Sequence, residues 1–130
     1  MRKKHLYAFA FIGWMVFVTF SSLYSFEGSG LSRINIPYGD KVVHFIFYFV
    51  AAVLGSLFII ETKEVKSVLI KNLKLLALLL IFFGIIIEVI QEGMTINRSG
   101  DVFDALANSL GVILGIIGIF TQFQGQRGLK

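Results

Sequence analysis

Four long runs of apolar residues dominate the chain and leave little room for a soluble fold. They cover residues 6–26, 42–60, 69–91 and 102–120. Each run supplies about 20 helical residues, which at ~1.5 Å per residue cross a hydrocarbon layer ~30 Å thick. The runs do not alternate between apolar and polar residues, as membrane β-strands would. The sequence therefore predicts one all-α domain over residues 1–130, an integral membrane four-helix bundle.

The composition agrees with this class. Hydrophobic residues make up 56% of the chain and charged residues 15%, against roughly 45–50% and 25% in soluble domains. The chain has no cysteine, which excludes a disulfide framework or a thiolate metal site. The net charge of +4 is spread over loops and termini, so it indicates topology and no nucleic-acid partner. Membrane lipids are the expected surroundings.

The distribution of Lys and Arg predicts the orientation of the bundle. Nine of these residues lie at the termini and between the second run and the uncharged centre of the third run (residues 75–87), and three lie in the other two connections. The positive-inside rule then places both termini in the cytoplasm, with the connections 27–41 and 91–101 facing outward. The first run is longer than a signal-peptide core and no A-x-A site follows it, so we expect a retained anchor. We expect a multi-pass protein of the bacterial cytoplasmic membrane.

The unusual polar residues gather at the ends of the runs that are predicted to face outward. They are Asp40, His44 and Tyr48 around the start of the second run, Glu88 and Gln91 at the end of the third, and Arg98, Asp101, Asp104 and Asn108 around the start of the fourth. Ionisable residues inside a span usually face the bundle interior or a water-filled cavity. Gly111 and Gly115 continue the last stripe and allow close packing, within the chain or between chains. The sequence thus predicts a polar pocket shared by three helices.

Some of these residues also have simpler explanations. Asp101 is a suitable N-cap for the fourth helix, and Asp40 lies near the expected headgroup region. Arg98 can pair with a lipid phosphate or with one of the acids. A single interfacial histidine such as His44 is often only a satisfied polar residue. Glu88, Asp104 and Asn108 are harder to explain in this way, because buried carboxylates need partners or protons.

Three segments in order resemble the VanZ-like family, bacterial membrane proteins named after an accessory factor in teicoplanin resistance. The segments are DKVVHFIFYF, EVIQ and NRSGDVFDALANSLGVILG. The family pattern has D-K-x-x-H-x-x-x-[YF] at one helix start, E-x-x-Q at the next helix end, then an arginine and D-x-x-x-N-x-x-G. These positions are Asp40, Lys41, His44, Tyr48, Glu88, Gln91, Arg98, Asp104, Asn108 and Gly111.

The resemblance covers residues 38–120, and the first run matches only in being apolar. The connection EGMTINRSG lacks the proline that the family often has there. The resemblance implies a compact four-helix membrane protein and, for some members, resistance to lipoglycopeptides. It therefore informs the fold more than the function.

Three functions fit the predicted pocket. It can bind or help to modify a cell-envelope component, such as a lipid or a peptidoglycan precursor. It can belong to a membrane-embedded hydrolase or transferase, in which His44, Glu88 and Asp104 are the hypothetical catalytic residues or the ligands of a divalent metal. It can also serve a transporter subunit. No nucleophile motif such as G-x-S-x-G or H-E-x-x-H is present, and the sequence identifies no cofactor and permits a homo-oligomer.

Overall fold

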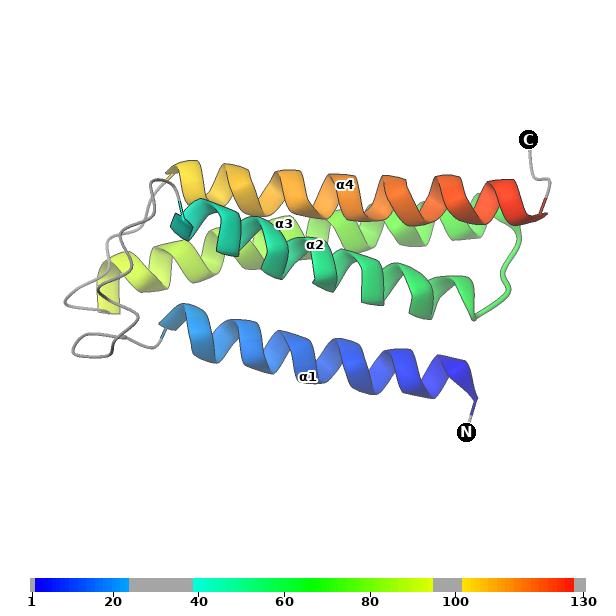
Figure 1. Cartoon of the computed structure of the whole chain (residues 1–130), viewed down its shortest axis with the longest axis horizontal. Coiled ribbons are helices and arrows are strands. Elements are labelled where there is room, and N and C mark those ends of the chain that lie inside the picture. The colour runs from blue at the N-terminus through cyan, green and yellow to red at the C-terminus, as the bar shows by residue number, and fades with distance from the viewer. Residues whose placement is uncertain (1, 24–38, 95–101, 128–130) are drawn as a thin grey trace.

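The structure is a computed structural model that describes residues 2–23, 39–94 and 102–127. This part of the chain forms four α-helices and contains no strand. In chain order they are α1 (Lys3–Leu23), α2 (Gly39–Ile60), α3 (Lys66–Met94) and α4 (Val102–Arg127) (Figure 1). The predicted all-α class is confirmed.

Each of the four helices is long and apolar enough to cross a membrane. Large apolar side chains cover the outside of the bundle, as Phe9, Phe82 and Val102 illustrate with 65%, 62% and 74% of their surface exposed. An apolar exterior of this extent is unusual for a soluble monomer. α2 and α3 begin about one turn before the predicted apolar runs, and α4 continues about two turns beyond residue 120. The helices are longer than the predicted runs because backbone hydrogen bonds can continue through polar residues at the helix ends.

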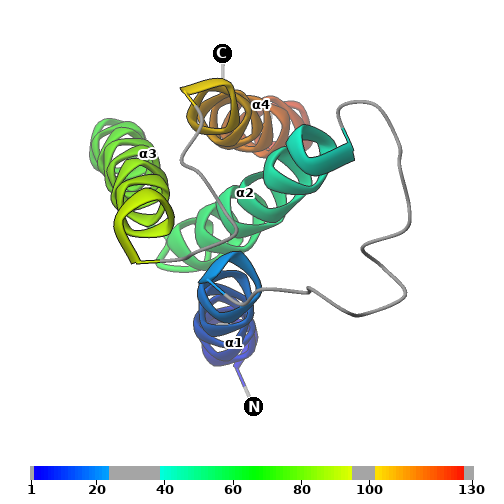
Figure 2. The ribbon, with the colours of Figure 1, turned by 90° about the vertical axis from the view of Figure 1, so that its left-hand side faces the viewer.

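Helix α2 is the central helix of the bundle. It packs against α1, α3 and α4, and its contact with α4 is the most extensive in the described part of the chain (Figure 2). Consecutive helices run in opposite directions, so the C-terminal ends of α1 and α3 lie at the same end of the bundle as the N-terminal ends of α2 and α4 (Figure 1). The three helix ends expected to form the pocket are therefore brought together.

The contact between α2 and α4 depends on glycine. A Cβ atom on Gly111 would overlap the carbonyl oxygen of Phe45 and lie 3.0 Å from the backbone nitrogen of Phe49. A Cβ atom on Gly115 would lie 2.9 Å from the Cβ of Ala52. The backbones of the two helices thus approach each other directly, as small residues permit in membrane helices. The predicted packing role of Gly111 and Gly115 is found within the chain.

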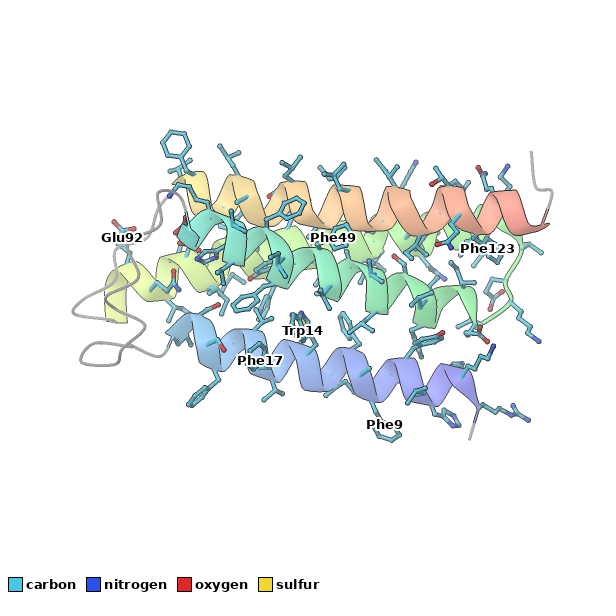
Figure 3. The ribbon with its side chains drawn as sticks, in the orientation of Figure 1. Phe9, Trp14, Phe17, Phe49, Glu92 and Phe123 are labelled. Carbon is cyan, nitrogen blue, oxygen red and sulfur yellow. The ribbon has the colours of Figure 1, made fainter. Side chains whose placement is uncertain are left out.

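Helix α1 packs against α2 through aromatic side chains. The indole nitrogen of Trp14 donates a hydrogen bond of 2.8 Å to the carbonyl oxygen of Phe47. The rings of Trp14 and Phe17 also lie edge-on or tilted against each other and against Phe47, with centroids 5.2–6.0 Å apart. Figure 3 shows Trp14 between the two helices. Gly13 is the one glycine of α1, and a Cβ atom added to it would have no atom within 4 Å. It therefore makes no close helix–helix contact of the kind found at Gly111.

Candidate functional site

Four polar side chains from three helices are buried at the end of the bundle where α2 and α4 begin and α3 ends. They are His44 of α2, Glu88 of α3, and Asp104 and Asn108 of α4, with 7%, 6%, 6% and 1% of their surface exposed. We refer to these four residues as the polar cluster. They stand out because the buried side chains below them are mainly apolar, including Ala51, Ala52, Leu80 and Val112.

The helical spacing of α4 explains how two members of the cluster reach the interior. Asp104, Asn108, Gly111 and Gly115 recur every three or four residues, and all four are buried. Residues at this spacing share one face of a helix. The face that brings the glycines against the backbone of α2 therefore also turns Asp104 and Asn108 toward His44. On α2, His44, Tyr48, Ala51 and Gly55 form the matching buried stripe.

His44 is the centre of the cluster. Its Nδ1 lies 3.2 Å from Oδ1 of Asn108, within hydrogen-bond distance, and 3.5 Å from Oε1 of Glu88. Its Nε2 lies 3.6 Å from Oδ2 of Asp104. The imidazole is thus placed between carboxylates from two different helices. Such an arrangement can exchange a proton with a bound group or hold a cation.

Lys41 extends the cluster toward its exposed rim. Its Nζ lies 3.2 Å from Oδ1 of Asp104, and its side chain is 24% exposed. Asp104 therefore bridges Lys41 and His44 through its two oxygens. Asp104 also belongs to the first turn of α4, where the positive end of the helix dipole favours a carboxylate. We did not include Lys41 among the expected pocket residues and named it only as a position of the VanZ-like pattern.

Gln91 and Tyr48, which we expected among the binding residues, have different environments. Gln91 donates a hydrogen bond from Nε2 to the carbonyl oxygen of Ser22, so it connects α3 to α1. Tyr48 is 1% exposed, and its hydroxyl has no hydrogen-bond partner in the part of the chain that the structure describes. The ring of Tyr48 lies beside Asn108, because Cε1 of Tyr48 and Nδ2 of Asn108 are both 3.2 Å from the position of a Cβ atom on Gly84. Glu92, one turn from Glu88, is exposed at the end of α3 (Figure 3).

Three of the predicted site residues are not described in full. Arg98 and Asp101 lie outside the described residues. Asp40 belongs to the first turn of α2, but its side chain is outside the described part. The predicted roles of these three residues in binding stay predictions.

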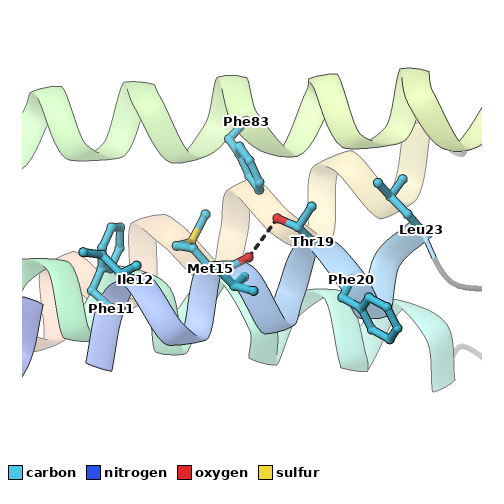
Figure 4. Close-up of a pocket in the computed structure, with 8 residues that line it drawn as sticks. Phe11, Ile12, Met15, Thr19, Phe20, Leu23 and Phe83 are labelled. Atoms are coloured by element: carbon cyan, nitrogen blue, oxygen red, sulfur yellow. Dashed lines mark hydrogen bonds between the residues drawn. The ribbon is translucent and has the colours of Figure 1, made fainter. Parts of the chain in front are cut away.

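An apolar groove of about 670 Å³ lies between α1 and α3. Side chains of α1, nearly all apolar, form most of its lining, and Phe83 reaches from α3 toward α1 (Figure 4). The hydroxyl of Thr19 in its wall is satisfied by the carbonyl oxygen of Met15 at 2.8 Å. The ring of Phe83 also contacts that of Tyr48, with centroids 6.4 Å apart. Phe83 thus separates the groove from the interior that contains the polar cluster.

The cluster contains a set of metal-ligand types. One nitrogen of His44 and one carboxylate oxygen each from Glu88 and Asp104 all lie within 4.8 Å of one another. No other group of this kind occurs among residues 2–23, 39–94 and 102–127. Comparison with models of protein families, with curated proteins and with solved structures finds no match to the chain. The resemblance to VanZ-like proteins therefore depends on the residue pattern alone.

Proposed function

We propose that the chain is a multi-pass membrane protein of the VanZ-like kind that binds the polar head of a cell-envelope component at its polar cluster. The component would be an envelope lipid or a peptidoglycan precursor. The observation that carries this proposal is the burial of His44, Glu88, Asp104 and Asn108 together at one end of a bundle with an apolar exterior. Ionisable groups inside a membrane bundle are costly and usually serve a function.

The groove between α1 and α3 is a second reason to propose a ligand that has both an apolar chain and a polar head. Its walls are almost entirely apolar, which suits an acyl or polyprenyl chain. Gln91 and Ser22 join α3 to α1 at the end of the bundle where the cluster lies. A lipid with its chain in the groove would have its polar head at the level of the cluster. Lys41, at the exposed rim, offers a positive charge to a phosphate or carboxylate.

The proposed orientation places the cluster on the outer side of the bacterial cytoplasmic membrane and both termini in the cytoplasm. The lysines at the other end of the bundle, including Lys3, Lys63 and Lys66, support it through the positive-inside rule. In intact cells, cysteines introduced at Ser29 and Ser99 should react with an impermeant thiol reagent. A cysteine at Ser67, at the start of α3, should react only after permeabilisation. The reverse pattern would refute the orientation.

Ligand binding can be tested on the full chain in detergent with two labelled probes, a polyprenyl phosphate and a phosphatidylglycerol. We expect His44→Gln to weaken binding of one probe at least ~10-fold, since a hydrogen bond to a charged group contributes ~1.5–3 kcal/mol. His5→Gln is the matched control, because His5 is exposed on α1 at the opposite end. Equal binding by wild type and His44→Gln for both probes would contradict the proposal.

A membrane-embedded enzyme is the second candidate, and the position of His44 between Glu88 and Asp104 favours it. A histidine oriented by a carboxylate can act as a general acid or base. Release of inorganic phosphate from the polyprenyl phosphate probe, lost in His44→Gln and kept in His5→Gln, would support a hydrolase. For a link to glycopeptide resistance, expression of the wild type should lower susceptibility to teicoplanin, and expression of His44→Gln should not.

A further inference from the structure

We propose that His44, Glu88 and Asp104 bind one divalent transition-metal cation, with the ligand preference of zinc. Imidazole nitrogen favours transition metals over Mg²⁺ or Ca²⁺, and carboxylates are accepted by Zn²⁺ as well. Three protein ligands with one open position are the usual arrangement of a zinc ion that binds water or a substrate. Cysteine is absent from the chain, and among the residues that the structure describes this nitrogen and oxygen set is the one group of three such ligands.

The spacing of the three side chains fits one ion. Metal–ligand bonds of ~2.0–2.2 Å at tetrahedral angles place neighbouring ligand atoms ~3.4 Å apart. Nε2 of His44 and Oδ2 of Asp104 are 3.6 Å apart, and the three ligand atoms lie within 4.8 Å of one another. Oε1 of Glu88 lies 3.5 Å from Nδ1, the other ring nitrogen, so the Glu88 side chain would turn toward Nε2 to complete the coordination. The three ligands come from α2, α3 and α4, so an ion would connect three helices.

Asn108 and Lys41 contact the proposed metal ligands in the way that hydrogen-bond partners of metal ligands usually do. When Nδ1 of His44 donates its hydrogen to Oδ1 of Asn108, at 3.2 Å, the lone pair of Nε2 faces Asp104. Lys41 contacts Oδ1 of Asp104 and leaves Oδ2 on the side of His44. Histidine ligands commonly donate their second ring hydrogen to a fixed acceptor, and carboxylate ligands are themselves hydrogen-bonded.

The charge of the site also favours a cation. Glu88 and Asp104 are both buried beside His44, and they come from two different helices. Carboxylates in a poorly solvated place need a compensating positive charge. A divalent cation between them would supply it. Its open coordination position would then accept an oxygen of an anionic headgroup.

A second, independent observation points to a bound group. The hydroxyl of Tyr48 and Nδ2 of Asn108 are buried, and neither has a hydrogen-bond partner among the described residues. Both residues are 1% exposed, and Asn108 contacts His44. The ring of Tyr48 lies beside Asn108, because Cε1 of Tyr48 and Nδ2 of Asn108 are both 3.2 Å from the position of a Cβ atom on Gly84. Unsatisfied buried polar atoms of this kind are rare in native structures. A water or headgroup oxygen at the open metal position would give them a partner.

Metal binding goes beyond the proposed function, because it can be measured with no lipid probe present. The full chain in detergent is stripped with a chelator, equilibrated with Zn²⁺, Mn²⁺ or Mg²⁺ separately, and gel-filtered. Elemental analysis should give about one zinc per chain. Competition with a chromophoric chelator should show tighter binding of zinc than of manganese, and of manganese than of magnesium.

The variants separate ligands from ordinary polar residues. His44→Gln and Glu88→Gln should weaken zinc binding by at least ~100-fold, since loss of an outer-sphere partner alone costs ~10–100-fold. The matched controls His5→Gln and Glu92→Gln change exposed residues of the same types and should bind zinc as the wild type does. Circular dichroism and elution volume test whether each variant folds.

The wild type alone can also decide the question if a ligand variant does not fold. Zinc should raise its thermal midpoint, and a chelator should reverse the rise, because an ion that binds only the folded state stabilises it. A wild type that retains no zinc, a His44→Gln variant that retains the same zinc, or equal affinity for magnesium would each overturn the proposal. Lipid binding by a metal-free wild type would leave the proposed function standing without this site.

Discussion

Helices α4 and α1 pack against the same helix, α2, in two different ways. At Gly111 the nearest atoms of α2 all belong to its backbone, and at Gly115 they are the carbonyl oxygen of Phe49 and the small side chain of Ala52. α1 meets it through large aromatic side chains, with Trp14 bonded to the carbonyl oxygen of Phe47. α1 also borders the open apolar groove. The contact of α2 with α4 is therefore close and involves the backbone, whereas its contact with α1 is made by side chains and borders an open groove.

The closer packing of α4 corresponds to its contribution of side chains to the polar cluster. α4 contributes Asp104 and Asn108 to the polar cluster, and their distances to His44 depend on the position of α4 relative to α2. Functional groups must be held to within ~0.5 Å, which rigid packing provides. The described residues of α1 contribute no side chain to the cluster. The role that we propose for α1, as a wall of the groove for a lipid chain, does not require such accuracy.

The largest expected effect is that of Gly111→Ala. The added Cβ would overlap the backbone of Phe45, which cannot move aside as a flexible side chain can. We expect a loss of about 3 kcal/mol in the free energy of unfolding, the upper end for overpacked sites. Unfolding in a detergent titration, followed by circular dichroism, measures it.

Gly118→Ala is the control for this change. Gly118 is in the same helix and an added Cβ meets no atom within 4 Å. Alanine should be neutral there, or stabilise the helix by up to ~1 kcal/mol. Equal stability of the Gly111 and Gly118 variants would show that the α2–α4 contact is not as close as described.

A smaller effect is expected for Trp14→Phe. This change removes the hydrogen bond to Phe47 and keeps an aromatic ring between α1 and α2. Hydrogen bonds between membrane helices average ~0.6 kcal/mol, so the same titration should show a loss of about that size. Ser109→Ala is the comparison, because the hydroxyl of Ser109 bonds within α4 to Ala105. If Trp14→Phe costs more than Gly111→Ala, the contrast between the two contacts is reversed.

The smallest effect is expected for Phe9→Ala. Phe9 points away from the bundle and is 65% exposed (Figure 3). Lipid chains are as apolar as the side chain, so its loss should change the free energy of unfolding by less than ~0.5 kcal/mol. Phe82→Ala, at 62% exposed on α3, should behave in the same way. A large, concentration-dependent loss for Phe9→Ala alone would mean that α1 meets a second copy of the chain.

The helices and the convergence of the cluster could be expected from the sequence. Helix length follows from the thickness of the hydrocarbon layer. Antiparallel neighbours place the start of α2, the end of α3 and the start of α4 at one end. Hydrocarbon then excludes the polar side chains of His44, Glu88 and Asp104 from the outside. Helix length, the order of the helices and the positions of polar residues along them can all be read from the sequence.

The individual contacts of Lys41 and Gln91 could not be predicted in this way. Lys41 lies near a helix end, where a lysine can equally extend its ammonium into the headgroup region, and the contact with Asp104 depends on how α2 and α4 are rotated. Gln91 bonds to a backbone carbonyl, that of Ser22, and every residue offers such a group. Arg98 and Asp101 lie outside the described residues, so their predicted roles stay predictions.

The backbone contact at Gly111 also limits how the protein can move. A helix that touches its neighbour's backbone cannot rotate about its own axis, or slide by one residue, without placing a Cβ atom in the contact. We therefore expect α2 and α4 to move together and to keep the distances among His44, Asp104 and Asn108. α3 has less extensive contacts with α2 and α4 than these two helices have with each other, so we expect it to tilt first if the proposed ligand enters the bundle. Glu88, on α3, would then be the member of the cluster that moves relative to the other three.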